Sequence, residues 1–258
     1  MLLYMNKIRI GITGQSGFVG TNLHNKLQEY PEKYECIPFE DIFWQDERVL
    51  RDFVKQCDVI FHFACLVRSP KPGAVYDTNI KLGNQLVNAM IMEDVHPCVL
   101  FASSIQEFDE SEYARCKRET REQLSNWAKQ HNTGFAGLIF PNLFGPHARP
   151  NSHSFIATFC YKLTHGEQPE VLVDNNVSLK FIDNLIGEMV ATMDQLVEEK
   201  FNRSVRFQPD FTMKVTKVLD ILTHIKQTYF DNGIEPEIKT DAELYLFSTF
   251  KSYINYTL

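Results

Sequence analysis

The sequence predicts an α/β fold in which a parallel sheet is wound with helices on both faces. The prediction rests on strand-like and helix-like segments that alternate through the first half of the chain, and on a glycine-rich loop that directly follows the first apolar run. This is the Rossmann-type doubly wound arrangement. We expect residues 1–145 to form a dinucleotide-binding region, and residues 146–258 to form mainly a small C-terminal substrate-binding cap that partly returns to the main sheet.

Each predicted strand is a short apolar run that ends in polar or glycine-containing residues, and each predicted helix is a longer stretch with an apolar face. In the first region the predicted strands are 8–13, 35–39, 59–63, 98–102 and 136–141. The helices predicted between them are 22–30, 46–55, 78–93 and 113–130. In the second region we predict helices at 154–163, 184–198 and 216–229, extended segments at 170–173 and 178–182, and a strand near Arg206.

The composition excludes several classes of protein. With 258 residues, 44% of them hydrophobic, the chain can bury a large core. The net charge of −7 argues against a nucleic-acid surface, and no apolar run is long enough to span a membrane. The run Met1–Met5 is too short for a signal peptide, so we expect a cytoplasmic protein. The six cysteines contain no Cys-x-x-Cys pair, and we predict buried free thiols and no metal site.

The segment Thr13–Gly20 has the pattern of a loop that binds dinucleotide phosphates, because it joins a strand to a helix at the start of the chain. Gly14 allows the tight turn that leaves the strand, Gly17 lets the backbone approach the pyrophosphate, and Gly20 permits the helix to pack closely on the sheet. A plain turn is the alternative. The other loop residues predicted to bind the cofactor are Ser16, Phe18 and Val19.

Acidic residues refine the cofactor prediction. Glu40 and Asp41 follow the second strand, where a carboxylate would accept hydrogen bonds from the ribose hydroxyls of NAD and repel a 2′-phosphate. This position favours NADH. The alternative is that Glu40 and Asp41 are solvated acids of a loop. Asp58, just before the third strand, is either an adenine contact or a strand-end acid. His62, within that apolar strand, is predicted to be structural.

Tyr113 and Lys117 lie one helical turn apart, shortly after a strand that ends in Ser103 and Ser104. Tyrosine and lysine are frequent, so the spacing alone is weak evidence and the position after the fourth strand carries the prediction. There Lys117 would bind ribose hydroxyls and lower the pKa of the phenol, which makes Tyr113 an acid or base at neutral pH. Ser104 would hydrogen-bond the reacting carbonyl or hydroxyl. Together these residues indicate a redox enzyme.

In order along the chain, these motifs resemble those of the extended short-chain dehydrogenases/reductases, the nucleotide-sugar epimerase/dehydratase group. The resemblance covers nearly the whole chain. It implies that the cofactor also contacts Phe63, Ala64, Asn79 and Pro141, in addition to Tyr113 and Lys117. It further implies a homodimer built through the helices that flank the catalytic tyrosine.

One branch is more similar still. The segments Ser103–Gln106, Pro141–Gly145 and Pro150–Lys162 look like the reductase domain of capsule and O-antigen enzymes that reduce the 4-keto group of a UDP-2-acetamido-2,6-dideoxy-L-hexos-4-ulose. The resemblance implies an NAD(P)H-dependent 4-ketoreductase for L-fucosamine- or L-rhamnosamine-type sugars. The residues then expected to bind the UDP-sugar are Arg68, Gln106, Asn142, Arg149, Ser154 and Lys180.

The chain departs from that branch in three respects. Bacterial members are commonly fused to a C-terminal cupin domain that performs 3-epimerisation, and this chain stops at Leu258, so we expect separate epimerase polypeptides. Members carry an arginine near Glu40 that suits NADPH, whereas this chain has the acidic pair. Many relatives have an arginine where Ile139 stands, which shifts phosphate recognition toward Arg149, Lys180 and Asn142.

Two alternatives stay open. The first is a nucleotide-sugar epimerase or dehydratase that holds NAD tightly and returns the hydride. In dehydratases an Asp-Glu pair commonly follows the catalytic serine or threonine, whereas Ile105 and Gln106 follow Ser104 here. The second is a non-catalytic dinucleotide-sensing protein of the same fold, in which the tyrosine and lysine are usually lost. Retention of Tyr113 and Lys117 counts against it.

Overall fold

A computed structural model describes residues 7–152 and 154–256. By its internal contacts the chain divides into two compact units. The first contains the chain up to residue 140 together with residues 186–207, and the second contains residues 141–185 and the chain from residue 208 onward. The assignment of cofactor binding to residues 1–145 and of substrate binding to residues 146–258 stays a prediction.

The first unit is built on a six-stranded sheet in which every neighbouring pair of strands is parallel. The strands lie in the order β2-β1-β3-β4-β5-β8. Their bounds are β1 Ile8–Thr13, β2 Tyr34–Ile37, β3 Val59–His62, β4 Cys98–Ser104, β5 Phe135–Phe140 and β8 Asn202–Arg206. The chain runs outward from β1 to β2 and then returns to place β3 on the other side of β1. The carboxyl ends of β1 and β3 therefore form the switch point at which such sheets bind ligands.

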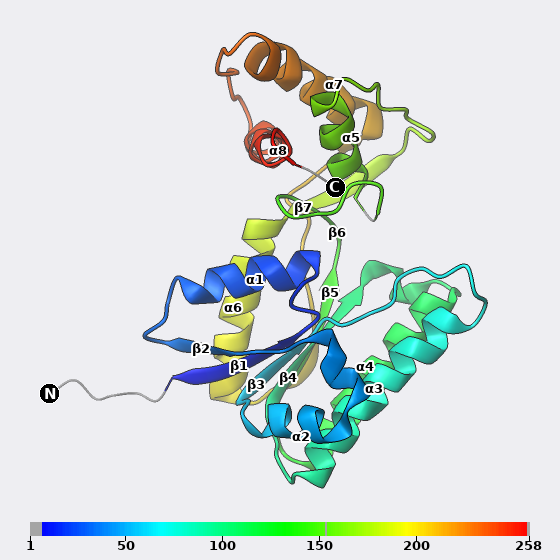
Figure 1. Ribbon diagram of the computed structural model, residues 1–258, viewed down its shortest axis with the longest axis vertical. Coiled ribbons are helices and arrows are strands. Elements are labelled where there is room, and N and C mark those ends of the chain that lie inside the picture. Colours follow the sequence, from blue (N-terminus) through cyan, green and yellow to red (C-terminus); the bar gives the residue numbers. More distant parts are fainter. Residues whose placement is uncertain (1–6, 153, 257–258) are drawn as a thin grey trace, which may run out of the picture. The chain divides into compact units, whose positions relative to one another are not determined.

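Helices cover both faces of this sheet (Figure 1). One face carries α2 Glu47–Lys55, α3 Ala74–Met92 and α4 Glu112–Gln130, and the other carries α1 Phe18–Gln28 and most of α6 Ile182–Glu199. Short 3-10 turns follow two strands, at Asp41–Gln45 and at Ile105–Phe108. A cluster of buried side chains, among them Phe53, Leu86, Phe101 and Trp127, packs α2, α3 and α4 on the sheet.

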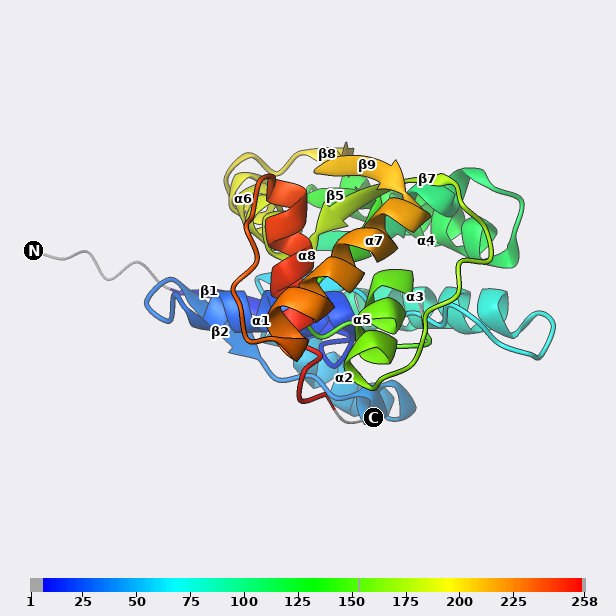
Figure 2. The same cartoon turned by 90° about the horizontal axis from the view of Figure 1, so that it is seen from above.

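The second unit has a three-stranded sheet in the order β6-β7-β9, with bounds β6 Asn142–Phe144, β7 Asn176–Phe181 and β9 Phe211–Lys214. Its helices α5 Phe155–Thr164, α7 Val215–Ile225 and α8 Asp241–Lys251 lie side by side (Figure 2), and a π-helical turn, Lys226–Asp231, follows α7. Tyr253, fully buried, donates a hydrogen bond to the carbonyl oxygen of Ala148 and so ties the segment after α8 to the loop before α5.

The predicted fold class is confirmed, and every strand and helix predicted in the first region is present within a few residues. The strand predicted near Arg206 is β8. The extended segment predicted at 170–173 is wrong: no strand forms there, and Leu172 and Val173 are 87% and 68% exposed. Apolar residues form a strand only where a partner strand satisfies the backbone, and this segment has none. The elements β6, β9 and α8 were not predicted from the sequence.

Among the described residues, none of the helices combines the length and the apolar character that crossing a membrane requires.

Candidate active site

The glycine-rich loop lies at the switch point of the first unit, between the end of β1 and the start of α1. Gly14 has φ +74°, and a Cβ atom there would lie 2.7 Å from the backbone nitrogen of Ala64, just after β3. A Cβ atom on Gly20 would lie 2.3 Å from the carbonyl oxygen of Gly14. Gly20 therefore has no room for a side chain because the backbone of the loop itself lies against it. The expected reason, close packing of the helix on the sheet, is not the one that the structure shows.

The first turn of α1 is free of competing negative charge. Gly17 is the N-cap, no side chain caps the helix, and the first turn contains no acidic residue. Ser16 and Gly17 are exposed, and Phe18 and Val19 are half-buried. A helix N-terminus of this kind directs N–H groups and a partial positive charge at an anion. The loop therefore fits the pyrophosphate of a dinucleotide.

The predicted catalytic residues come together at the carboxyl end of β4 and the start of α4. Ser104 is the last residue of β4, and its hydroxyl oxygen accepts a hydrogen bond of 3.1 Å from the backbone N–H of Gln106. Lys117 is 4% exposed, and its ammonium group donates a 2.8 Å hydrogen bond to the carbonyl oxygen of Ala102. The same ammonium lies 5.5 Å from the centroid of the Tyr113 ring.

The structure corrects the expected titration of Tyr113. Burial raises the pKa of the phenol above its ordinary value of 10.0, while the positive charge of Lys117 opposes that rise. From the sequence, the charge of Lys117 was expected to lower the pKa of the phenol. Desolvation is the larger effect, because the phenolate loses its hydration when the side chain is buried. Tyr113 is therefore a protonated phenol at neutral pH, the form that a proton donor needs.

Asn79 organises the segment that follows β3. Its carboxamide accepts a 2.8 Å hydrogen bond from the backbone N–H of Leu66 and donates one of 2.8 Å to the carbonyl oxygen of the same residue. Nearby, the backbone N–H of Phe63 donates to the carbonyl oxygen of Thr13 at 3.1 Å. Asn79 therefore holds in place the segment that carries Phe63 and Ala64, whereas its direct contact with a cofactor stays a prediction. Arg68 is exposed a little further along.

Asp58 does not lie where a cofactor contact requires it. It precedes β3, at the end of the strand opposite to the glycine loop, and Arg9 holds it through a backbone N–H at 2.9 Å and a guanidinium nitrogen at 2.7 Å. The hydrogen bonds and charge of Arg9 lower the pKa of this carboxyl. The prediction of an adenine contact is therefore replaced by the strand-end alternative, since dinucleotides bind at the carboxyl ends of the strands.

The acidic pair after β2 and the histidine of β3 lie where the sequence predicts them. Glu40 and Asp41 are exposed at the carboxyl end of β2, where Asp41 begins a 3-10 turn. The prediction that His62 is structural is confirmed: the ring is buried and its Nδ1 is 2.8 Å from the hydroxyl of Thr13. Burial and the nearby Lys117 lower its pKa to about 3.

Four of the residues predicted to bind substrate belong to the second unit. Asn142 is exposed and donates a 3.3 Å hydrogen bond to the carbonyl oxygen of Ser178. Arg149 is exposed, and Ser154 caps α5 by accepting a hydrogen bond from Ala157. Lys180 is 2% exposed, with its ammonium 3.1 Å from Asp210. The ion pair gives Lys180 a structural role, and its contact with substrate stays a prediction. Pro141 is buried.

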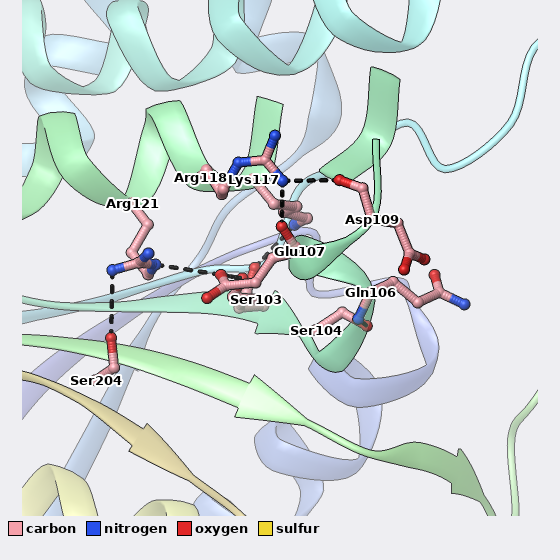
Figure 3. Close-up of polar contacts among 10 residues, drawn as sticks. Ser103, Ser104, Gln106, Glu107, Asp109, Lys117, Arg118, Arg121 and Ser204 are labelled. Carbon is pink, nitrogen blue, oxygen red and sulfur yellow. Dashed lines mark hydrogen bonds and ion pairs between the residues drawn. The ribbon is translucent and has the colours of Figure 1, made fainter. Parts of the chain in front are cut away.

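Sequence reasoning missed one group of residues. Glu107, in the short turn Ile105–Phe108, is only 1% exposed, and its carboxylate accepts hydrogen bonds from Ser103 and Arg121 (Figure 3). The sequence offered one signal for these contacts: Arg118 and Arg121 lie one turn apart on the predicted helix, downstream of Glu107.

The cysteines and acidic groups form no metal centre in the described part of the chain. Within residues 7–152 and 154–256, no cluster of three or more His, Cys, Asp or Glu side chains is arranged to hold a metal ion. All six cysteines are free thiols. Four are buried as predicted, whereas Cys36 and Cys65 are partly exposed.

The family model described as "NAD dependent epimerase/dehydratase family" matches residues 10–203, which include the glycine loop, Ser104, Tyr113 and Lys117. The chain belongs to the NAD dependent epimerase/dehydratase family. This membership agrees with the position of the loop at the switch point and of the tyrosine–lysine pair beside it.

Relatives of this family member include a UDP-2-acetamido-2,6-beta-L-arabino-hexul-4-ose reductase from Pseudomonas aeruginosa. The two sequences are 27% identical over 230 residues, which cover 86% of this chain and 58% of the relative. The chain thus spans less than two thirds of the curated relative that it matches.

Solved structures of similar fold come from several bacteria. The capsular polysaccharide assembling protein CapF from Staphylococcus aureus superposes with a TM-score of 0.77 at 25% identity, covering 97% of this chain and 67% of CapF. A UDP-glucose 4-epimerase from Thermotoga maritima, solved with UDP-glucose, gives 0.78 at 18% identity, covering 95% of this chain and 98% of the epimerase. The Bordetella bronchiseptica enzyme WbmF, solved with NAD+ and UDP, gives 0.76 at 14% identity, covering 96% and 92%.

Proposed function

We propose that the chain is an NAD(P)H-dependent 4-ketoreductase of a UDP-linked 2-acetamido-2,6-dideoxy-L-hexos-4-ulose in the biosynthesis of deoxy-amino sugars. The observation that carries the proposal is the juxtaposition of the Lys117 ammonium and the Tyr113 ring, 5.5 Å from ammonium nitrogen to ring centroid, beside Ser104 at the end of β4. The reductase from P. aeruginosa, 27% identical, supports the choice of reaction and substrate.

The residues present fit a dinucleotide cofactor, which would be held by the loop Gly14–Gly20, by the segment Phe63–Ala64 and by Lys117. When bound in its reduced form, that cofactor supplies a hydride for carbon 4 of the keto sugar. The chain supplies the proton. Because burial keeps Tyr113 protonated, its phenol donates a proton to the oxygen on carbon 4 as negative charge develops there.

Ser104 stabilises the acceptor of that proton, and Lys117 stabilises its donor. The hydroxyl oxygen of Ser104 accepts the N–H of Gln106, so its proton is available to the substrate oxygen and stabilises the charge that develops on it. The buried ammonium of Lys117 stabilises the phenolate that Tyr113 becomes, and its anchor on Ala102 keeps it beside the ring.

For the substrate we propose contacts from Arg68 and Gln106 near the sugar ring, and from Asn142, Arg149 and Ser154 with the UDP moiety. Lys180 is the weakest member of this set because Asp210 already compensates its charge. We also propose that the protein acts in the cytoplasm as a homodimer and that separate epimerase polypeptides serve the same pathway. The acidic pair Glu40 and Asp41 supports NADH over NADPH.

The test is a reductase assay with the full chain. The purified protein is incubated with NADH or NADPH and with the 4-keto product of a UDP-N-acetylglucosamine 4,6-dehydratase/5-epimerase, and absorbance at the nicotinamide band is followed together with the mass of the sugar product. We expect one reduced cofactor to be consumed for each keto sugar, and a product two hydrogen atoms heavier. No consumption with either cofactor would reject the reductase.

An epimerase is the second candidate, favoured by the UDP-glucose 4-epimerase structure that matches along almost the full length of both chains. It would interconvert UDP-sugars without net consumption of NADH or NADPH. Incubating the protein with UDP-glucose or UDP-N-acetylglucosamine and separating the epimers distinguishes the two functions, since only the epimerase changes the stereochemistry of carbon 4 without added reductant.

A further inference from the structure

The carboxylate of Glu107, in the turn that follows Ser104, is buried. Glu107 belongs to the 3-10 turn Ile105–Phe108, which starts at Ser104, and its side chain is 1% exposed. Burial of a carboxylate is costly unless hydrogen bonds and an opposite charge compensate it. A turn at the surface could have kept this side chain in water, so its burial needs an explanation in the surrounding contacts.

Two groups provide the compensation (Figure 3). The hydroxyl of Ser103, which precedes Ser104 in β4, donates a hydrogen bond to the Glu107 carboxylate. The Nε of Arg121 donates to the same carboxylate at 3.2 Å, and the Arg121 side chain is 22% exposed. Another nitrogen of the guanidinium lies 3.4 Å from the hydroxyl of Ser204 in β8. The carboxylate thus joins β4, the turn and α4.

Arg118, one turn before Arg121 on α4, completes the link (Figure 3). Its guanidinium donates to the backbone carbonyl oxygens of Glu107 and Asp109, the latter at 2.8 Å. Helix α4 also carries Tyr113 and Lys117. Two arginines of one helix therefore hold the turn that begins at Ser104, and the same helix carries the other two catalytic side chains.

We propose that Glu107 is a positioning residue of the active site: its carboxylate, held by Ser103 and Arg121, fixes the turn Ile105–Phe108 against α4 and so sets the Ser104 hydroxyl relative to Tyr113 and Lys117. This proposal rests on the proposed reductase function for its kinetic part. The physical basis is preorganisation, since a catalytic hydrogen bond displaced by about 1 Å costs on the order of 100-fold in rate.

The experiment uses the full chain with Glu107→Gln, which keeps the shape of the side chain and removes its charge. We expect kcat for the keto sugar to fall about 10- to 100-fold with less than about threefold change in KM. In a Ser104→Ala background the same substitution should lower kcat by less than about twofold, because Glu107 acts through Ser104. Glu110→Gln, in the same loop but exposed, is the matched control and should leave the rate unchanged.

Hydrogen exchange of the backbone provides a readout that needs no substrate. In Glu107→Gln, peptides covering residues 103–111 should exchange faster than in the unmodified protein, while peptides of α3 should not change. Arg121→Gln removes the ion pair from the side of its less buried partner and should give the same exchange pattern. This second variant keeps the proposal testable if Glu107→Gln fails to fold.

The outcomes separate the two proposals. An unmodified protein that does not reduce the keto sugar rejects the proposed function, and the exchange of residues 103–111 then decides by itself whether Glu107 holds the turn. Unchanged exchange in both variants overturns the positioning role. So does an equal loss of kcat with and without the Ser104 hydroxyl, because that result would make Glu107 independent of Ser104.

Discussion

The ammonium group of Lys117 lies 5.5 Å from the centroid of the Tyr113 ring, one helical turn away on α4. A hydrogen bond to the carbonyl oxygen of Ala102 holds the ammonium there, and its side chain is almost fully buried. In such a setting a positive charge acts on the phenol at short range and with little screening by solvent. The pair thus couples the charge state of Tyr113 to a fixed cation.

Replacement of Tyr113 by phenylalanine should remove the proton donor. We expect Tyr113→Phe to lose about two to four orders of magnitude in turnover of the keto sugar while binding NAD(P)H normally. Steady-state kinetics and the fluorescence of bound cofactor measure the two effects. Tyr30→Phe, at a 42% exposed position outside the site, is the control and should be fully active. Near-normal turnover of Tyr113→Phe would remove this phenol from the mechanism.

The acidic pair after β2 should set the choice of cofactor. If the exposed carboxylates of Glu40 and Asp41 bind the adenine ribose, NADH supports the reaction better than NADPH, and the double variant Glu40→Ala with Asp41→Ala narrows the preference. The ratio of kcat/KM for the two cofactors is the measurement. Glu32→Ala, before β2, should leave the ratio unchanged. A strong preference for NADPH in the unmodified protein would show that these acids do not face the ribose.

A methyl group at Gly20 should damage the phosphate loop. The added Cβ would lie 2.3 Å from the carbonyl oxygen of Gly14 and 2.8 Å from the Cα of Gln15, both backbone atoms that cannot move without reshaping the loop. We expect Gly20→Ala to weaken binding of NAD(P)H by about tenfold or more, measured by fluorescence titration.

The matched control is Gly187→Ala in α6, where a Cβ atom would meet nothing within 4 Å. This substitution should leave cofactor affinity unchanged and raise the free energy of unfolding by about 0.5–1 kcal/mol, because alanine favours the helix. Equal cofactor binding by the two variants would show that the loop tolerates the methyl group.

His62 should make stability depend on pH. Its folded-state pKa of about 3 lies below its ordinary value of 6.5, so the unfolded chain binds a proton that the folded chain does not. The neutral buried ring of His62 contributes its full share to the free energy of unfolding at pH values above 6.5, the pKa in the unfolded chain. That contribution is lost as the pH falls from 6.5 toward 3. Within that window this histidine alone lowers the free energy of unfolding by about 1.4 kcal/mol per pH unit.

Urea unfolding at a series of pH values measures this slope. His62→Gln should be less stable at neutral pH but should have a shallower slope between about pH 6 and 4, because it lacks the titrating ring. His147→Asn is the control: His147 is exposed with φ +69°, a conformation that asparagine also adopts, and its slope should match the unmodified protein. Equal slopes for the His62 variant and the unmodified protein would contradict the assigned burial effect.

The parts of the molecule that the sequence alone determined are those governed by local spacing. The run Ile8–Thr13, the glycines that follow it and the helical spacing of Tyr113 and Lys117 each reflect the conformation of a few adjacent residues. Their position in an alternating series of strands and helices then implied the parallel sheet, because the carboxyl ends of parallel strands meet at one edge. For that reason the positions of the loop and of the Tyr113 and Lys117 side chains could be predicted together.

Only the tertiary structure decided which polar side chains are buried and what they contact. Asp58 precedes its strand and pairs with Arg9, Lys180 pairs with Asp210, and Glu107 is buried between Ser103 and Arg121. These partners are 4 to 49 residues apart in sequence, and each pairing depends on which elements pack together. The direction in which the pKa of Tyr113 shifts was likewise undetermined by the sequence. Burial raises this pKa and the charge of Lys117 lowers it, and only the packed structure shows that burial is the larger effect.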